Sequence, residues 1–132
     1  MDNIYPDSSL KIKYQDDYKR STFFKRINEF KENPIGHNKV VFLGNSITNG
    51  LRRHFSKFNR SDVVNRGIDG DISLGILERL DELIYYKPKA VFILIGLNDF
   101  FNDLTKMTEV TPKFVSKNII KAAKIIKRAT PK

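Results

Sequence analysis

The sequence predicts an α/β fold in which short buried strands alternate with helices. Residues 40–43 and 90–95 are apolar without interruption, which is typical of strands that are covered on both faces. Segments with apolar side chains at every third or fourth position lie before, between and after these two runs. Alternation at these lengths favours a parallel sheet with helices on both of its faces.

The first half of the chain holds a leading helix and two strands. Residues 14–30 carry aromatic and aliphatic side chains at helical spacing, and residues 33–36, Asn-Pro-Ile-Gly, provide a stop. Residues 40–43 form the first strand, and residues 49–58 can hold a short helix. Residues 62–65 then read as a second short strand.

A longer helix and a third strand follow. Apolar side chains keep helical spacing over residues 72–84, and Asp71 is placed to cap the start of this helix. Residues 90–95 are the strongest strand of the chain. After a polar loop, Thr111 and Pro112 begin a final helix as its cap and its first residue.

Composition and charge restrict the function classes. The 132 residues suffice for one domain, which we divide into a leading helix segment, residues 1–37, and an α/β unit, residues 38–132. With no cysteine and only two histidines, we expect no disulfide, no metal site and no cofactor. The net charge of +9 is dispersed, and its densest stripe follows one face of the final helix. We therefore expect no nucleic-acid partner.

The N-terminus and the hydropathy bear on location. The first twenty residues lack the basic start and apolar run of a secretory signal, and no window approaches the length of a membrane span. The sequence thus predicts no membrane-spanning segment. It leaves the compartment open, either cytosolic or, if a signal has been removed, periplasmic or secreted.

Small polar residues stand at the end of each predicted strand. Ser46 follows the first strand, Gly67 the second and Asn98 the third. If the first strand lies between the other two, these ends are neighbours at the edge where such folds bind ligands. The hydroxyl of Ser46 could then act as a nucleophile. The N–H groups of Ser46 and Gly67 and the amide of Asn98 could converge on one oxyanion.

These blocks resemble those of a known enzyme family. Residues 42–48, Phe-Leu-Gly-Asn-Ser-Ile-Thr, resemble the first block of the SGNH hydrolases, which are GDSL esterases and lipases. Residues 65–67, Asn-Arg-Gly, resemble their second block, and residues 96–99, Gly-Leu-Asn-Asp, resemble their third block, GxND. The resemblance covers roughly residues 38–132 and leaves the leading helix aside.

The resemblance implies a flavodoxin-like three-layer α/β/α fold and a serine esterase. It assigns Ser46 as the nucleophile and places Gly67 and Asn98, with the N–H of Ser46, in the oxyanion hole. The form of the first block is similar to that of bacterial members that remove acetyl groups from carbohydrates. The implied substrate is therefore a small acyl ester, an O-acetyl ester on a carbohydrate above all.

The chain departs from the family pattern in two ways. Asn45 replaces the usual aspartate before the serine. The family's histidine, which belongs to a DxxH block near the C-terminus, has no counterpart in the sequence. His37 precedes the first strand and His54 lies eight residues past Ser46, so we expect neither to reach the hydroxyl. The chain then looks truncated after its third strand and the following helix, without a general base and with feeble activity.

Four carboxylates are expected near the site, but an exposed carboxylate with an ordinary pKa is a weak base toward serine. They are Asp69, Asp71, Asp99 and Asp103. Structural roles explain two of them more simply, a helix cap for Asp71 and a cap on the following loop for Asp99. Arg66 reads as an exposed arginine rather than a substrate contact.

Two further interpretations stay open. A flavodoxin-like module could bind a ligand or a partner without catalysis, and Ser46 would then be an ordinary helix cap. The third strand is apolar on both alternating faces and would be an uncovered sheet edge in a three-stranded domain. Self-association through this edge is therefore an expected property of the chain.

Overall fold

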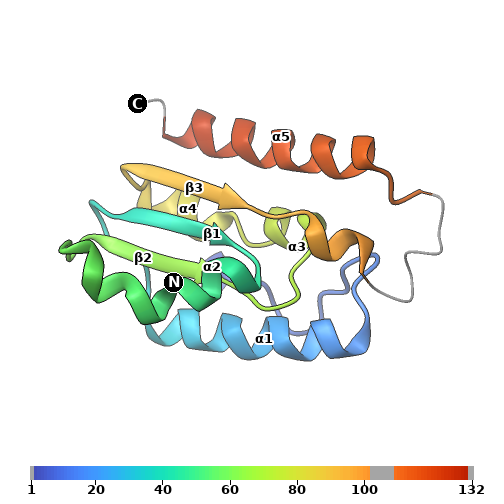
Figure 1. Ribbon diagram of the computed structural model, residues 1–132, viewed down its shortest axis with the longest axis horizontal. Coiled ribbons are helices and arrows are strands. Elements are labelled where there is room, and N and C mark those ends of the chain that lie inside the picture. The colour runs from blue at the N-terminus through green and yellow to red at the C-terminus, as the bar shows by residue number, and fades with distance from the viewer. Residues whose placement is uncertain (1, 102–108, 131–132) are drawn as a thin grey trace.

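Three parallel strands form the sheet at the centre of the computed structural model, which describes residues 2–101 and 109–130 (Figure 1). The strands are β1 (Val40–Gly44), β2 (Val63–Gly67) and β3 (Ala90–Leu94). Their order is β2-β1-β3, and both neighbours run parallel to β1. The first strand therefore lies between the other two, as the flavodoxin-like order implied by the resemblance requires, and the three carboxyl ends meet at one edge.

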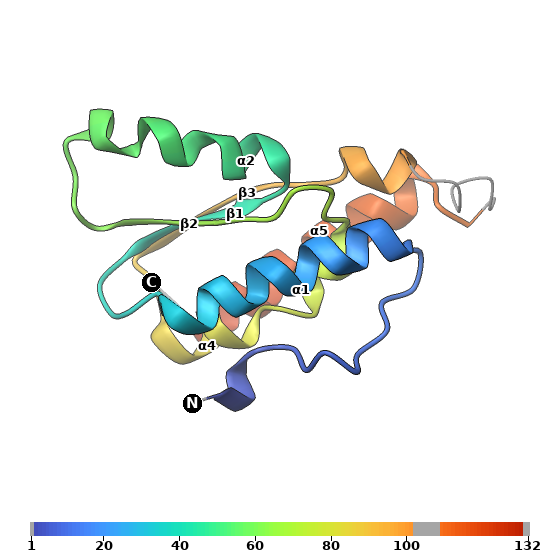
Figure 2. The ribbon, with the colours of Figure 1, turned by 90° about the horizontal axis from the view of Figure 1, so that it is seen from below.

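Helices cover the two faces of the sheet unequally (Figure 2). The short helix α2 (Ser46–Gly50) and the 3-10 segment η2 (Leu51–Phe58) lie on one side. The helices α1 (Asp17–Glu32), α4 (Asp81–Tyr86) and α5 (Pro112–Ala129) lie on the other. The remaining elements are α3 (Ser73–Leu77), η1 (Asp2–Ile4) and η3 (Leu97–Phe100). This arrangement is the predicted three-layer α/β/α fold.

Two clusters of buried apolar side chains lie on the side of the longer helices. Val41 and Leu43 of β1 pack with side chains of α3, α4 and α5, among them Ala122. Phe23 and Ile27 of α1 pack in a second cluster with Ile68 and Ile72, which follow β2. Because α1 shares this cluster, the leading segment is tied to the α/β unit by core packing.

The opposite face of the sheet carries an aromatic cluster. Phe42 of β1 contacts Phe55 and Phe58 of η2, with ring centroids 5.4 and 5.9 Å away. It also contacts Phe92 of β3 at 5.0 Å. The segment predicted as a short helix over residues 49–58 thus folds mostly as the 3-10 helix η2. Its aromatic side chains pack onto the sheet.

The helix predicted over residues 72–84 is interrupted, and this prediction is wrong. The structure forms α3 and α4 instead, with residues 78–80 between them. In the interruption the N–H of Arg79 bonds Ile76 O, three residues back, at 3.1 Å. The guanidinium of Arg79 is buried at the strand ends, where it bonds Asp71 and Gly44. The start of α5 is as predicted, because Thr111 caps it and Pro112 stands in its first turn.

β3 is an edge strand in the described part of the chain. The side chains of Phe92 and Leu94 are 58% and 52% exposed, whereas Val91 and Ile93 pack partly against the core. The apolar edge that the sequence predicts is therefore present. No helix within residues 2–101 and 109–130 has the length and apolar character that a membrane span requires.

Candidate active site

The turn after β1 exposes Ser46 at the end of the central strand. Asn45 is the N-cap of α2, and its side-chain oxygen accepts from the N–H of Ile47 at 3.1 Å. Ser46 is the first residue of the helix, and its side chain is exposed. Asn45 therefore fills the capping role that Ser46 would otherwise have, and the Ser46 hydroxyl is left at the surface.

Gly67, at the end of β2, lies directly beside this turn. A Cβ atom there would overlap with the backbone nitrogen of Asn49 and would lie 2.7 Å from its Cα. Only glycine lets β2 and α2 approach so closely. The N–H of Gly67 donates to Oδ1 of Asn65 at 2.8 Å, and Nδ2 of Asn65 donates to Thr48 O at 2.6 Å. Asn65 thus ties β2 to α2 and occupies the N–H expected in the oxyanion hole.

Asn98 lies in η3, after β3. Its Nδ2 donates to Asp71 O at 3.2 Å, and the second N–H of this amide makes no hydrogen bond to a described residue. The buried ammonium of Lys19 in α1 donates to Phe101 O at 2.8 Å and to Asn98 O at 3.4 Å. Gly96 adopts a φ of +124°, which favours glycine at the start of this turn. The η3 turn is therefore held by hydrogen bonds to Asp71 and to Lys19 of α1.

Asp99 has a structural role, but not the predicted one. Its carboxylate is buried and accepts from the N–H and the hydroxyl of Ser73 at 2.9 and 2.6 Å. Burial raises the pKa of Asp99, and the hydrogen bonds from Ser73 oppose that shift. The expectation that Asp99 caps the following loop is wrong, because it binds the start of α3 instead.

A buried ion pair lies beneath the strand ends. Arg79 Nη2 is 2.8 Å from Asp71 Oδ2, and neither side chain is more than 4% exposed. The same guanidinium donates to Arg66 O at 2.6 Å and to Gly44 O at 3.0 Å. Asp71 does accept from Ile72 N–H, but the cap residue of α3 is Ile72, which makes no side-chain cap bond. The Asp71 carboxylate therefore holds Arg79 against the ends of β1 and β2.

Arg66 forms a second buried pair, which corrects the expectation that it is exposed. Its side chain is 5% exposed and bonds Glu82 of α4 at 2.8 Å. It also donates to Asn33 O at 2.6 Å and stacks on Phe30 at 4.2 Å from the ring centroid. Arg66 therefore joins β2 to α1 and α4 inside the molecule.

A hollow of about 340 Å³ lies beside Ser46. It is lined by Ser46, Asn49, Gly50, Arg52, Arg53 and Asp69. Gly67 and Asn98 are not part of its lining. The three predicted residues thus stand at one edge of the sheet, while the open space around the hydroxyl is formed by α2, η2 and Asp69. Only Asp69 of these neighbours was expected from the sequence.

Neither histidine is among the described residues that line this hollow. His37 packs on Tyr86, with ring centroids 5.2 Å apart, before β1 begins, and His54 lies in η2. Asp103 lies outside the described residues. Within those residues, no three His, Asp or Glu side chains gather where they could hold a metal ion.

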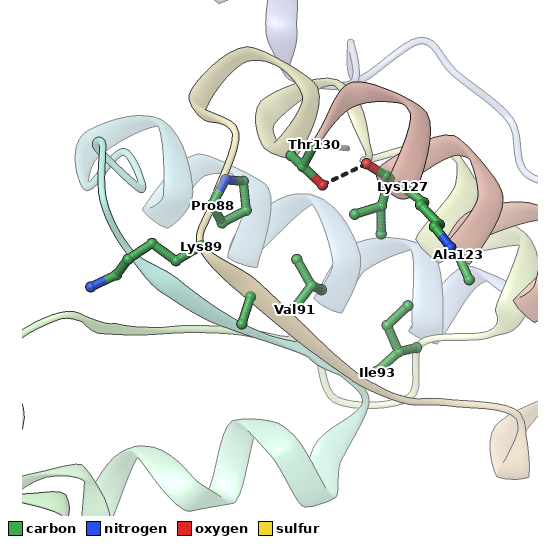
Figure 3. Close-up of a pocket in the computed structure, with 9 residues that line it drawn as sticks. Pro88, Lys89, Val91, Ile93, Ala123, Lys127 and Thr130 are labelled. Atoms are coloured by element: carbon green, nitrogen blue, oxygen red, sulfur yellow. Dashed lines mark hydrogen bonds between the residues drawn. The ribbon is translucent and has the colours of Figure 1, made fainter. Parts of the chain in front are cut away.

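A second hollow lies on the opposite side of the sheet from α2, far from Ser46 in the sequence. It has a volume of about 300 Å³ and is lined by β3 residues such as Val91 and Ile93 and by α5 residues such as Ala123 (Figure 3). Thr130, at its rim, donates to Ile126 O at 2.8 Å. Its lining contains none of the three residues predicted for the site, Ser46, Gly67 and Asn98.

The parallel sheet with helices on both faces defines an α/β protein, a class that binds ligands beyond the carboxyl ends of its strands. Residues 42–132 match the GDSL-like lipase/acylhydrolase family, and the chain belongs to this family. The family hydrolyses ester bonds, which agrees with the resemblance of the three strand-end blocks.

Solved structures support the fold. Thirteen chains match, among them the crystal structure of a protein described as a GDSL-like lipase from Parabacteroides merdae ATCC 43184. It shares 22% sequence identity and a TM-score of 0.54, and the match covers 74% of this chain and 58% of the other. The chain thus spans less than two thirds of that protein. No curated protein matches.

Proposed function

We propose that the chain is a serine esterase that cleaves small acyl esters, with O-acetyl groups on carbohydrates as the preferred class. The observation that carries the proposal is Ser46, which stands exposed beside a hollow at the end of the central strand, in a member of an acylhydrolase family. The resemblance of the first block to acetyl-removing enzymes supports the acyl group.

In the proposed reaction, Oγ of Ser46 attacks the ester carbonyl carbon and the C=O electron pair moves to the oxygen. The N–H of Ser46, the N–H of Gly67 and the free amide N–H of Asn98 hold this oxyanion, and one such donor is typically worth about 3 kcal/mol. Collapse expels the alcohol and leaves an acyl-Ser46, which water hydrolyses. Asn65 must release the Gly67 N–H for this donor to act.

We further propose that this chain works slowly, because its own histidines do not line the hollow of Ser46. The serine proton then passes to water or hydroxide rather than to a positioned base. The Ser46-dependent rate should consequently rise steadily with pH instead of levelling off near neutrality.

Replacing Ser46 with alanine is expected to reduce hydrolysis of p-nitrophenyl acetate to the background rate measured in buffer without protein. Without the triad histidine, the residual rate over water is on the order of 10³ or less. The control variant is Ser56→Ala, because Ser56 is an exposed serine of η2 outside the hollow. Equal rates for the wild type and Ser46→Ala, or an equal loss in Ser56→Ala, would contradict the proposal.

A non-catalytic binding module is the second candidate, and one observation favours it. Both auxiliary donors are engaged inside the protein, Gly67 with Asn65 and Asn98 with Asp71 O. A chain that binds an ester at this edge without Ser46-dependent turnover would fit this candidate.

We also propose self-association through the edge strand β3, where the exposed side chains of Phe92 and Leu94 form an apolar surface. Phe92→Lys should shift the sedimentation coefficient toward that of the monomer, because a charge on an edge strand opposes pairing. Tyr18→Lys is the control, since Tyr18 is an 80% exposed aromatic residue on α1. A wild-type chain that sediments as a monomer at high concentration would overturn this proposal.

A further inference from the structure

The hollow beside Ser46 carries two arginines that the proposed reaction does not use. Arg52 and Arg53 are consecutive residues of η2, and both line the hollow together with Ser46. Both side chains are exposed to solvent. The lining also includes the small or short residues Gly50 and Asn49. A small ligand bound at Ser46 would therefore have guanidinium groups within its own cavity.

The guanidinium groups of Arg52 and Arg53 make few polar contacts with described residues of the protein. Arg52 Nη1 is 3.8 Å from Glu29 Oε2, and that oxygen already accepts from Arg26 at 2.9 Å. Arg53 makes no ion pair with any described residue. In contrast, the Arg66 and Arg79 guanidiniums are fully engaged with buried carboxylates. Arg52 and Arg53 thus keep N–H donors available for a ligand.

The charge of the hollow is positive on balance. Its single carboxylate, Asp69, accepts from Asn49 Nδ2 at 2.8 Å and is partly satisfied by that bond. Two guanidiniums against one carboxylate leave one excess positive charge. Arginine pairs with carboxylate and phosphate groups through parallel N–H donors, so the natural complement of this lining is an anionic group.

We propose that Arg52 and Arg53 form an anion-binding subsite and that the ester held at Ser46 carries a carboxylate or phosphate. The subsite rests on the proposed function, because the anion is part of the ester that Ser46 attacks. It would orient the ester and select charged substrates over neutral ones of the same length. Exposed charge pairs contribute modestly, so we expect a preference of about three- to tenfold.

The test measures binding rather than turnover, in the Ser46→Ala protein. Amide chemical shifts are followed by NMR while three esters are added, which are monomethyl succinate, methyl butyrate and 1-acetylglycerol 3-phosphate. We expect one or both anionic esters to bind at least about threefold tighter than methyl butyrate, with shifts at Asn49, Arg53 and Asp69. The two anionic esters distinguish a carboxylate from a phosphate preference.

Arg53→Gln and Arg52→Gln should each remove much of this preference, and added KCl should weaken it. Lys57→Gln is the matched control, because Lys57 is an exposed cation of η2 outside the hollow. Equal binding of charged and neutral esters, shifts elsewhere on the surface, or an equal loss in Lys57→Gln would overturn the subsite. This test measures no hydrolysis, so the two proposals can fail separately. If the anionic esters bind more tightly but p-nitrophenyl acetate shows no Ser46-dependent hydrolysis, the esterase alone is refuted.

Discussion

Arg79→Met is expected to lower the free energy of unfolding by about 3–5 kcal/mol, the largest effect of any substitution considered. The change leaves the carboxyl group of Asp71 buried without its cation. Burial already raises the pKa of Asp71, so the unpaired group must either stay charged at a large cost or take up a proton. It also removes the donors to Arg66 O and Gly44 O at the ends of β2 and β1. Since whole domains are stable by about 5–15 kcal/mol, urea unfolding followed by circular dichroism should show a large shift of the midpoint.

A double variant separates the buried charge from the lost packing. Adding Asp71→Asn to Arg79→Met removes the uncompensated charge, so part of the lost stability should return. Arg60→Met is the control, since Arg60 pairs with Asp62 at the surface and its loss should leave the midpoint unchanged within error. A destabilisation by Arg79→Met no larger than that of Arg60→Met would contradict a structural role for the pair.

Gly67→Ala is expected to cost about 2–3 kcal/mol of stability and to disturb the site. The added methyl group overlaps with Asn49 N, and it would lie 2.9 Å from Asn45 O. These neighbours are backbone atoms of the turn that carries Ser46, so relief of the overlap must move α2 or β2. The midpoint temperature of thermal unfolding and the Ser46-dependent rate of p-nitrophenyl acetate hydrolysis should both fall.

Gly50→Ala, at the end of α2, provides the matched comparison. A Cβ atom on Gly50 meets nothing within 4 Å, and its φ of −62° and ψ of −26° suit alanine. This change should raise the stability by about 0.4–1 kcal/mol. If Gly67→Ala and Gly50→Ala had the same effect on the midpoint, the close approach of β2 to α2 would not be required.

Much of the fold could be predicted because its signals are local. The uninterrupted apolar runs mark β1 and β3, and the Thr111 cap with Pro112 marks the start of α5. The position of β1 between β2 and β3 follows from the usual crossover topology. The β3 edge follows from apolar residues on both of its faces.

The buried ion pairs were missed because charged side chains are rarely buried. A signal for one of them was nevertheless present. Arg79 lies seven residues after Ile72 and three after Ile76, so it falls on the apolar face of the predicted helix. The structure shows this inward position, within the residues that separate α3 from α4. No such periodicity marks Arg66, because the pairing with Glu82 depends on how β2 and α4 pack.

The candidate site could be predicted only in part. The strand-end positions of Ser46, Gly67 and Asn98 follow from the sequence, and the fold brings the three strand ends together. The sequence did not indicate that Asn65 accepts from the Gly67 N–H, because this bond depends on the local turn. Nor did it indicate that Arg52 and Arg53 would share a hollow with Ser46, since η2 is a 3-10 segment.

Reaction with a fluorophosphonate, followed by mass spectrometry of the digested protein, tests the central claim that Ser46 is a nucleophile with an oxyanion site. The account predicts one adduct, on the peptide that contains Ser46, and its absence from the Ser46→Ala variant. The rate should be low, because neither His37 nor His54 lines the hollow, yet higher than that of the exposed serines Ser56 and Ser116. No adduct, or adducts spread evenly over the surface serines, would contradict the assignment of Ser46 as the nucleophile.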